Sequence, residues 1–315
     1  MLSEIQIAPM LDWTDSFFRQ FIRLITHRVT LYTEMIAEKA VIYGDADKLL
    51  KFTQIEQPLI LQIGGSTPLL MAQCSKIAEK KGFQGININA GCPSERVFAG
   101  AFGACLMAEP KKVASCIKAM KEETHLPISV KTRISLDIPE DKTDGFDACC
   151  RFIETNANAG CVRFIIHARK ARLKGLTPKE NRQKLALNYP LVYKIKKYFP
   201  EVEILINGQI LSLSEINEHL KYTDGAMIGR WAYADPYALK DIDSLYYQDN
   251  HPILSREEII LTLLPIIERY SKPLSATRHL MGLYAKTPLS KQWKQTLLIN
   301  KINEIEKFLQ KNQIK

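Results

Sequence analysis

Short apolar runs alternate with amphipathic stretches along most of the chain. Each run is rich in β-branched residues, is bounded by turn residues, and precedes a segment with helical periodicity. Eight such runs predict strands over residues 5–10, 29–35, 58–64, 85–91, 127–134, 162–168, 203–210 and 225–231. Between them, the periodicity predicts helices over residues 68–81, 110–123, 145–159, 190–198 and 214–220.

This alternation predicts an α/β fold of the TIM (β/α)8 barrel type, which needs about 250 residues. A doubly wound sheet is the alternative, but residues 5–15 lack the glycine turn that follows its first strand. Beyond residue 240, Ser255 and Glu258 form a capping-box pattern, and helices are expected over 256–270, 274–285 and 289–311. We therefore predict a barrel in residues 1–242 and a small C-terminal helical-bundle domain in residues 243–315.

Composition narrows the class of protein. Hydrophobic residues make up 46% of the chain and charged residues 24%, as in ordinary globular proteins. The apolar runs are too short to cross a bilayer, and the first residues lack the basic region of a secretory signal, so we expect a cytoplasmic protein with no membrane partner. Seven cysteines without CxxC or Cys/His spacing argue against a disulfide framework and a zinc site. No metal and no obligate protein partner are expected.

The positive charge is concentrated in one segment. The net charge is +9, and residues 161–200 hold eleven Lys or Arg against a single acid, Glu180. Seven of the eleven fall between Arg169 and Lys184, where Gly175 and Pro178 predict a loop rather than a helix. A basic run is most often a solvated surface. A long cationic loop, however, indicates a polyanionic partner.

Polar residues end every predicted strand. In a TIM barrel these ends form the active face, and burying unpaired polar groups there is costly. A ring of hydrogen-bonding groups above an apolar floor is typical of a site for a polar, planar ligand. The residues are Pro9, Met10 and Asp12, then Glu34, Gln62, Asn87, Asn89, Cys92, Lys131, Arg133, His167, Asn207 and Arg230.

Two loops at the last strands predict a phosphate site. Asn207-Gly208 and Gly229-Arg230 can present backbone N–H groups where barrels of this kind commonly hold phosphate. Lys131 ends an apolar strand, a costly position unless the ammonium faces a negative charge or extends to solvent.

Cys92 is the candidate catalytic residue. It lies between Gly91 and Pro93, directly after a predicted strand, and could be structural filler, a metal ligand or an acid. A thiol is protonated at neutral pH yet can release its proton to an enolate-like carbon. The glycine leaves the backbone unobstructed and the proline fixes the turn. The glycine-rich run to Met107 is predicted to form a mobile lid.

Taken in order, these motifs resemble the tRNA-dihydrouridine synthases, specifically their A-type branch. The resemblance covers residues 5 to 240 and extends weakly into the tail. It implies an FMN enzyme that uses NADPH to reduce the C5–C6 double bond of uridines 20 and 20a in the tRNA D-loop. The matching stretches are APMLDWTD, YTEM, LQIGGS, NINAGCPSERV, GACLM, VKTRI, HARKARLKGLTPKENR, INGQI, DGAMIGRWAYADP and HLMGLYAKTPLSKQWKQ.

The resemblance also implies roles for single residues. Reduced FMN would pass a hydride to C6 of uracil, and Cys92 would donate the proton to C5. Flavin contacts would fall on Pro9, Met10, Leu11, Gln62, Lys131, His167, Asn207, Gly208, Gln209, Gly229 and Arg230. Contacts to tRNA would fall on Asn89, Lys179, Arg182, Lys291 and Lys294, with the Asn89 amide reading the uracil edge.

This chain departs from the family pattern at two places. The common Asn-Gly-Gly motif reads Asn207-Gly208-Gln209, so the phosphate loop has one permissive residue fewer. In the tail, Lys291 and Lys294 stand where an RxxR pattern is expected. Lysine keeps the charge but lacks the bidentate fork of arginine.

Two other functions are compatible with parts of the pattern. A flavin enzyme like the dihydroorotate dehydrogenases would act on a free pyrimidine, for which the basic segment and the helical tail are unnecessary. A non-catalytic RNA-binding barrel would need neither flavin nor Cys92. Comparing the binding of tRNA with that of orotate distinguishes a tRNA-modifying enzyme from the first alternative. The yellow colour of a flavoprotein would count against the second.

Overall fold

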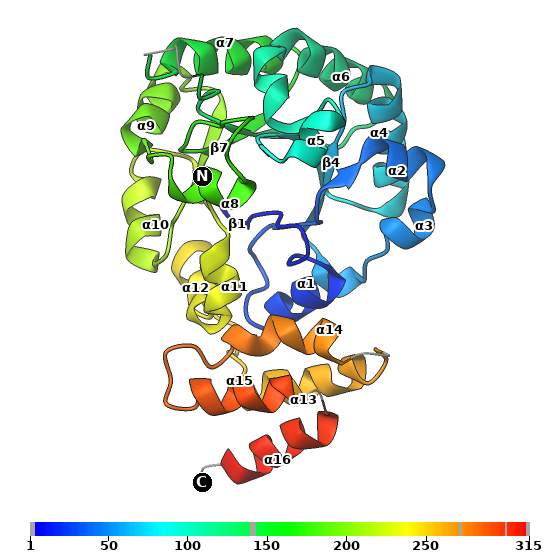
Figure 1. The fold of residues 1–315 in the computed structure, drawn as a ribbon, viewed down its shortest axis with the longest axis vertical. Helices are drawn as coiled ribbons and strands as arrows, with labels where there is room; N and C mark the ends of the chain where they lie inside the picture. The colour runs from blue at the N-terminus through cyan, green and yellow to red at the C-terminus, as the bar shows by residue number, and fades with distance from the viewer. Residues whose placement is uncertain (1–3, 139–142, 271–272, 300, 313–315) are drawn as a thin grey trace.

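The strands form a closed parallel barrel (Figure 1). The structure is a computed structural model that describes residues 4–138, 143–270, 273–299 and 301–312. Its sheet has the order β1-β9-β8-β7-β6-β5-β4-β2, with β3 also paired to β4, and a parallel bridge between Gln6 and Thr30 completes the circle. The TIM-barrel prediction is confirmed. The strands are β1 (Glu4–Ile7), β2 (Leu31–Tyr32), β3 (Ile36–Ala37), β4 (Leu59–Gly64), β5 (Gly85–Ala90), β6 (Ile128–Arg133), β7 (Arg163–His167), β8 (Glu203–Asn207) and β9 (Gly225–Ile228).

Several predicted strands are longer than the observed ones, and the strands expected over 5–10 and 203–210 end at Ile7 and Asn207. Of the strand expected over 29–35, only β2 forms, and it pairs with the start of β4. The unpredicted β3 follows just beyond this range and pairs with the end of β4. The last strand stops at Ile228, and Arg230 begins the short helix α11 (Arg230–Ala234). The Arg230 side chain is therefore presented from a helix start.

The five helices predicted between strands are all present. They are α4 (Pro68–Lys81), α6 (Pro110–Glu123), α7 (Phe146–Ala157), α9 (Tyr189–Tyr198) and α10 (Leu213–Leu220). Proline at the first position of α4 and α6 suits a helix start, because its missing N–H has no partner there in any case. The barrel also carries α1 (Ser16–Arg23), α2 (Glu38–Tyr43), α3 (Ala46–Leu49) and α12 (Ile242–Tyr247). Helices surround the strands on the outside (Figure 1).

The barrel interior is apolar in its middle and charged at the amino ends of the strands. Tyr32, Ile60, Ile165, Leu205 and Met227 belong to a buried cluster separate from the main core. This cluster closes the barrel, so the two ends form distinct cavities.

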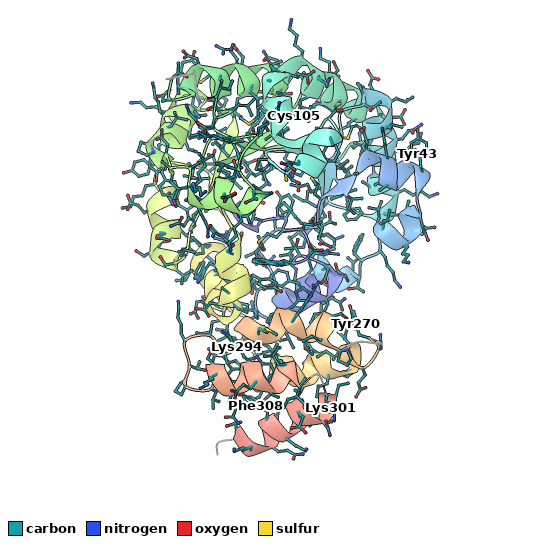
Figure 2. The ribbon with its side chains drawn as sticks, in the orientation of Figure 1. Tyr43, Cys105, Tyr270, Lys294, Lys301 and Phe308 are labelled. Atoms are coloured by element: carbon teal, nitrogen blue, oxygen red, sulfur yellow. The ribbon has the colours of Figure 1, made fainter. Side chains whose placement is uncertain are left out.

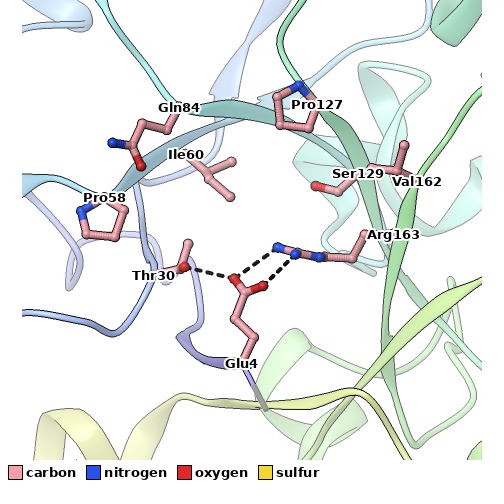
Figure 3. Close-up of a pocket in the computed structure, with 9 residues that line it drawn as sticks. All are labelled: Glu4, Thr30, Pro58, Ile60, Gln84, Pro127, Ser129, Val162 and Arg163. Atoms are coloured by element: carbon pink, nitrogen blue, oxygen red, sulfur yellow. Dashed lines mark hydrogen bonds and ion pairs between the residues drawn. The ribbon is translucent and has the colours of Figure 1, made fainter. Parts of the chain in front are cut away.

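The cavity at the amino ends is small, about 230 Å³, and is held by ion pairs (Figure 3). Arg163 pairs with Glu4 and, at 2.8 Å, with Glu203, and the Thr30 hydroxyl donates to Glu4 at 2.8 Å. Because each charge has a partner, we interpret this end as a structural plug.

The tail forms a helical unit below the barrel (Figure 1). It contains α13 (Arg256–Ile267), α14 (Leu274–Thr277), the 3-10 helix η4 (Arg278–Gly282), α15 (Ser290–Leu298) and α16 (Ile302–Asn312). The capping box of Ser255 and Glu258 is present. The single helix expected over 289–311 is two helices, packed through the rings of Tyr284, Trp293 and Phe308 with centroids 5.0–5.3 Å apart.

A buried histidine joins the tail to the barrel. His279 is fully buried, with Nε2 3.0 Å from Asp15 and Nδ1 3.1 Å from the Tyr233 hydroxyl. Asp15 caps α1, and Tyr233 stacks on Trp13 with ring centroids 4.3 Å apart. The tail thus contacts the segment that comes after β1.

The expected domain boundary at residues 242 and 243 falls inside α12. This helix packs on the barrel, where the Ile5 N–H donates to the Tyr247 hydroxyl at 2.8 Å. Within the described residues, no helix combines the length and the apolar character that spanning a membrane requires.

Candidate functional site

A cleft of about 810 Å³ opens at the carboxyl ends of the strands. It contains every residue predicted to contact a flavin, together with Cys92, Asn89 and Arg182. The fold therefore gathers at one place side chains that the sequence distributes over some 220 positions. The predicted flavin residues that line it are Pro9, Met10, Leu11, Gln62, Lys131, His167, Asn207, Gly208, Gln209, Gly229 and Arg230.

A ladder of buried amides positions the turn that carries Cys92. Asn87 donates to the Ser129 hydroxyl at 2.9 Å, and Gln62 donates to Asn87 at 2.7 Å. Asn89 donates to Gln62 at 3.0 Å, and its own side-chain oxygen accepts from the Cys92 N–H at 3.0 Å. Parallel neighbours in register allow this chain of contacts across β4, β5 and β6. Asn89, predicted to read a base, thus also fixes the turn of Cys92.

The main chain around Cys92 is held on both sides while its side chain remains partly exposed. Arg133 donates from Nε to the Gly91 carbonyl at 2.9 Å, and the Cys92 carbonyl accepts from the Ala104 N–H at 2.9 Å. The side chain lines the cleft rather than the packed core. This is the placement that a proton donor to a bound ligand requires.

The segment expected to be a mobile lid is helical. It consists of α5 (Glu95–Ala99) and the 3-10 helix η2 (Gly103–Ala108). Phe102 packs closely on the end of β4, because a Cβ on Gly64 would lie 2.4 Å from its ring. Gly103 has φ +78°, and a Cβ there would lie 2.7 Å from the Cys92 carbonyl oxygen. Opening of this segment stays a prediction.

The cleft is cationic and depresses the pKa of two partly buried bases. Burial, followed by the charges of Arg133 and Arg182, lowers the pKa of Lys131 to about 7. Its Nζ donates to Asn207 at 3.0 Å. Burial, followed by Arg133 and Lys131, holds the pKa of His167 well below its ordinary value, so its imidazole is neutral.

These residues fit an anionic ligand with a planar ring, such as the expected FMN. The lining includes four cations, Lys131, Arg133, Arg182 and Arg230, against one carboxylate, Asp12. The buried Nδ1 of His167 has no partner among the described residues, and a buried polar atom of this kind indicates a ligand contact.

The phosphate loop contains two residues with left-handed backbone. Gly208 has φ +131°, and a Cβ there would lie 3.0 Å from Leu187. Gln209 has φ +54°, a conformation that costs a residue with a side chain about 1–2 kcal/mol. Its side-chain oxygen accepts from Nη2 of Arg169 at 2.8 Å, and this hydrogen bond holds the residue in place.

Substitutions at Gln209 separate backbone strain from this hydrogen bond. Gln209→Ala keeps the strain and removes the contact to Arg169, whose Nη1 is already unpaired among the described residues. We expect it to lower the free energy of unfolding by about 1–2 kcal/mol. Gln209→Gly loses the same contact but relieves the strain, so its loss should be smaller by about 1 kcal/mol. Urea unfolding measures both, and equal losses would contradict the strain argument.

The basic segment is not the continuous loop that the sequence predicts. Residues Pro178–Gln183 form α8, which begins at a capping box between Thr177 and Glu180. The loop prediction is wrong here because proline, a common loop residue, also suits the first position of a helix. Four of the seven cations already bind protein groups, and they are Arg169, Lys170, Arg172 and Lys184.

The remaining tRNA candidates lie at two places. Arg182 lines the cleft, and Lys179, one helical turn earlier, is exposed on α8. Lys291 and Lys294 are exposed on α15 in the tail, and Figure 2 labels Lys294 there. These two lysines do not line the cleft.

Sequence reasoning missed several residues of the cleft. Trp13, Met35, Thr132 and Phe102 line it although they carry no charge that would have marked them. The Trp13 ring stacks on the ring of Tyr233 in α11, and this contact holds Trp13 in position. The sequence does not reveal the contact, because only the fold brings these two segments together.

Comparison with known families covers nearly the whole chain. The family model described as dihydrouridine synthase matches residues 6–315. The tRNA-dihydrouridine(20/20a) synthase of Synechocystis sp. is 44% identical over 300 residues, which are 94% of this chain and 89% of that protein. The protein of the same name from Escherichia coli strain K12 is 44% identical over 299 residues, covering 93% of this chain and 85% of its own length.

Solved structures with low sequence identity share the fold. Morphinone reductase in complex with tetrahydroNAD aligns with a TM-score of 0.52 at 9% identity, over 76% of this chain and 85% of that one. The old yellow enzyme homologue from Zymomonas mobilis aligns with a TM-score of 0.53 at 11% identity, over 80% and 90%. At such identities the likeness concerns the barrel alone.

Proposed function

Because the chain belongs to the dihydrouridine synthase family, we propose that it reduces the C5–C6 double bond of uridines 20 and 20a in tRNA. FMN is the proposed cofactor and NADPH the proposed reductant. The observation that carries the proposal is that one cationic cleft contains Cys92, Lys131 and the Nδ1 of His167, which has no partner in the part of the chain that the structure describes.

Within this cleft the chain's own residues have distinct tasks. Lys131, Asn207 and Arg230 would hold the anionic parts of the cofactor, and neutral His167 would offer it a hydrogen bond. When bound, reduced FMN supplies a hydride equivalent to C6 of uracil. Sγ of Cys92 would deliver the proton to C5, while the amide ladder fixes the turn from which it acts.

The proposed tRNA surface has two parts. The other three cations of the basic segment are Lys174, Lys179 and Arg182. Arg182 lines the cleft, and Lys174 and Lys179 are exposed. Lys291 and Lys294 would supply a second contact from the tail, residues 243–315. A folded RNA can span both, because RNA is recognised largely through its shape and its phosphates.

A direct assay tests this function. The purified chain is incubated with FMN, NADPH and unmodified tRNA, and dihydrouridine is mapped by mass spectrometry. Products at positions 20 and 20a are expected. Orotate should be neither bound nor reduced at comparable concentration, and the opposite preference would favour an enzyme of free pyrimidines. A colourless protein that binds tRNA and does not bind FMN would favour the non-catalytic alternative.

Single substitutions on α8 test the tRNA surface. Lys179→Ala and Arg182→Ala should each weaken tRNA binding on the order of three- to tenfold and lower the salt slope by about one. For exposed Lys179, NADPH oxidation without tRNA should persist, because the side chain lies outside the cleft. Filter binding across a salt series measures the effect.

Lys76→Ala is the matched control for these variants. Lys76 is an exposed lysine of the outer helix α4 and pairs with Glu123 at 3.0 Å. Its removal should leave tRNA affinity unchanged. If Lys179→Ala binds tRNA with unchanged affinity at physiological salt, the proposal that α8 contacts tRNA is wrong.

A further inference from the structure

Two histidines and an aspartate meet at the end of the barrel opposite the cleft. His27 precedes β2, Asp243 lies in α12, and His251 lies in the connector to α13. One ligand atom from each of the three lies within 4.8 Å of the others. Nothing in the proposed reduction uses this cluster.

Asp243 is fixed before any ligand arrives. Its carboxylate is almost fully buried and accepts hydrogen bonds from the Thr26 hydroxyl and from the N–H groups of His27 and Arg28. A carboxylate that is oriented by other hydrogen bonds is typical of metal ligands.

His251 lies beside two carboxylates. Its Nδ1 is 3.3 Å from the Asp249 carboxylate. Its Nε2 is 3.7 Å from Oδ2 of Asp243, a distance beyond an ordinary hydrogen bond. A metal ion between Nε2 and this oxygen would have both atoms as ligands.

His27 completes the set and gives access from solvent. Its ring stacks on that of His251, with centroids 3.8 Å apart, and its side chain is exposed. Being exposed, the ring can turn about its Cα–Cβ bond to direct a nitrogen at the gap.

We propose that His27, Asp243 and His251 bind a divalent transition-metal ion of the zinc class. Zinc binds nitrogen and oxygen ligands at about 2.0–2.2 Å, so one ion can bridge atoms up to roughly 4 Å apart. Two imidazoles and one carboxylate favour such an ion over Mg²⁺ or Ca²⁺, which prefer oxygen. Asp249, held by Arg28 at 2.6 Å, orients His251 from behind as the outer carboxylate of a metal site does.

The ion would fasten the connector of the tail to the barrel. Asp243 and His251 flank the residues that leave α12, and His27 belongs to the barrel itself. The site lies away from the cleft, so its role is to hold the tail's point of attachment rather than to take part in the reduction.

Metal titration of the untagged full chain tests the site. After chelator treatment, Co²⁺ is added and followed by its visible absorption, and Zn²⁺ is titrated by calorimetry. We expect one equivalent of each per chain and a Zn²⁺-dependent rise in thermal midpoint. His27→Ala and His251→Ala should each weaken binding at least tenfold, and Asp249→Asn should weaken it about 10- to 100-fold.

His125→Ala is the control, because His125 is exposed and lies outside the cluster. It should bind both metals like the unaltered chain. The proposal would be overturned if the unaltered chain showed no saturable metal binding. It would also be overturned if His27→Ala and His251→Ala bound the metals as tightly as His125→Ala does. Since His27 is exposed, its variant folds, and the result does not depend on the proposed reductase activity.

Discussion

Cys92→Ala is expected to lower the rate of dihydrouridine formation by about 10²–10⁴, the usual contribution of a positioned general acid. FMN content and tRNA affinity should remain, because the contacts that hold this turn use the backbone of residue 92 and not its sulfur. Mass spectrometry of tRNA after timed incubation gives the rate, and flavin absorbance gives the cofactor content.

Cys105→Ala is the matched control. Cys105 lies in η2, is partly buried, and donates from Sγ to the Phe102 carbonyl at 3.1 Å without lining the cleft. It should turn over at nearly the normal rate. Full turnover in Cys92→Ala, or an equal loss of rate in Cys105→Ala, would contradict the assignment of Cys92 as the proton donor.

Lys131→Met is expected to inactivate the enzyme and stabilise the protein without ligand. The ammonium is the cation that contacts Asn207 in the cleft, and removing such a charge costs about 10²–10³ in rate. Without a bound anion, however, burial and the charge of Arg133 destabilise the charged form of Lys131 in the folded protein. Replacing Lys131 with methionine removes this unfavourable charge and should stabilise the fold.

The sign of the pH dependence is set by the direction of the shift. The pKa of Lys131 is about 7 in the folded state, and lysine in an unfolded chain titrates near ~10.4. The unfolded state therefore binds more protons between these two pH values. The destabilisation of the folded state by charged Lys131 is complete below pH 7 and decreases as the pH rises toward ~10. Lys131→Met should raise the free energy of unfolding by about 1 kcal/mol or more at pH 6 relative to pH 9, allowing for partial solvent access.

Chemical unfolding of the ligand-free protein at the two pH values measures this difference. Lys118→Met is the control, because Lys118 is exposed on α6, and it should change stability little at either pH. A stabilisation that is equal at pH 6 and pH 9, or larger at pH 9, would contradict the assigned pKa direction.

The barrel could be predicted from sequence because its strands carry their own signal. Runs such as Leu59–Gly64 are buried along their whole length and read as continuous apolar segments. The second strand could be placed, but β3 just beyond it was missed, since its pairing with the end of β4 depends on register. The start of α8 does carry a sequence signal, the Thr177-x-x-Glu180 capping-box pattern, but Pro178 was interpreted as a loop residue although proline also suits the first position of a helix.

The candidate site was predictable wherever a residue stands at the end of a strand. The common direction of parallel strands brings Gln62, Lys131, His167 and Asn207 to one face, whatever their distance in sequence. The ladder from Ser129 to Cys92 was not predictable, because it depends on which residues face each other across three strands.

Contacts that the barrel makes with the C-terminal part of the chain gave no sequence signal. Asp15 and His279 meet through docking of the tail, and His27 meets Asp243 through the return of the chain after the last strand. Local spacing of cysteine and histidine cannot detect groups of this kind, because only tertiary structure brings His27, Asp243 and His251 together.

A single-turnover reaction tests most directly the claim that this cleft reduces a uridine in folded tRNA. Protein loaded with FMN is reduced beforehand, freed of NADPH, and mixed with unmodified tRNA or with orotate. We expect up to one dihydrouridine per FMN, at position 20 or 20a, and no reduced product from orotate. Reoxidation of the flavin by orotate with tRNA left unchanged would contradict it.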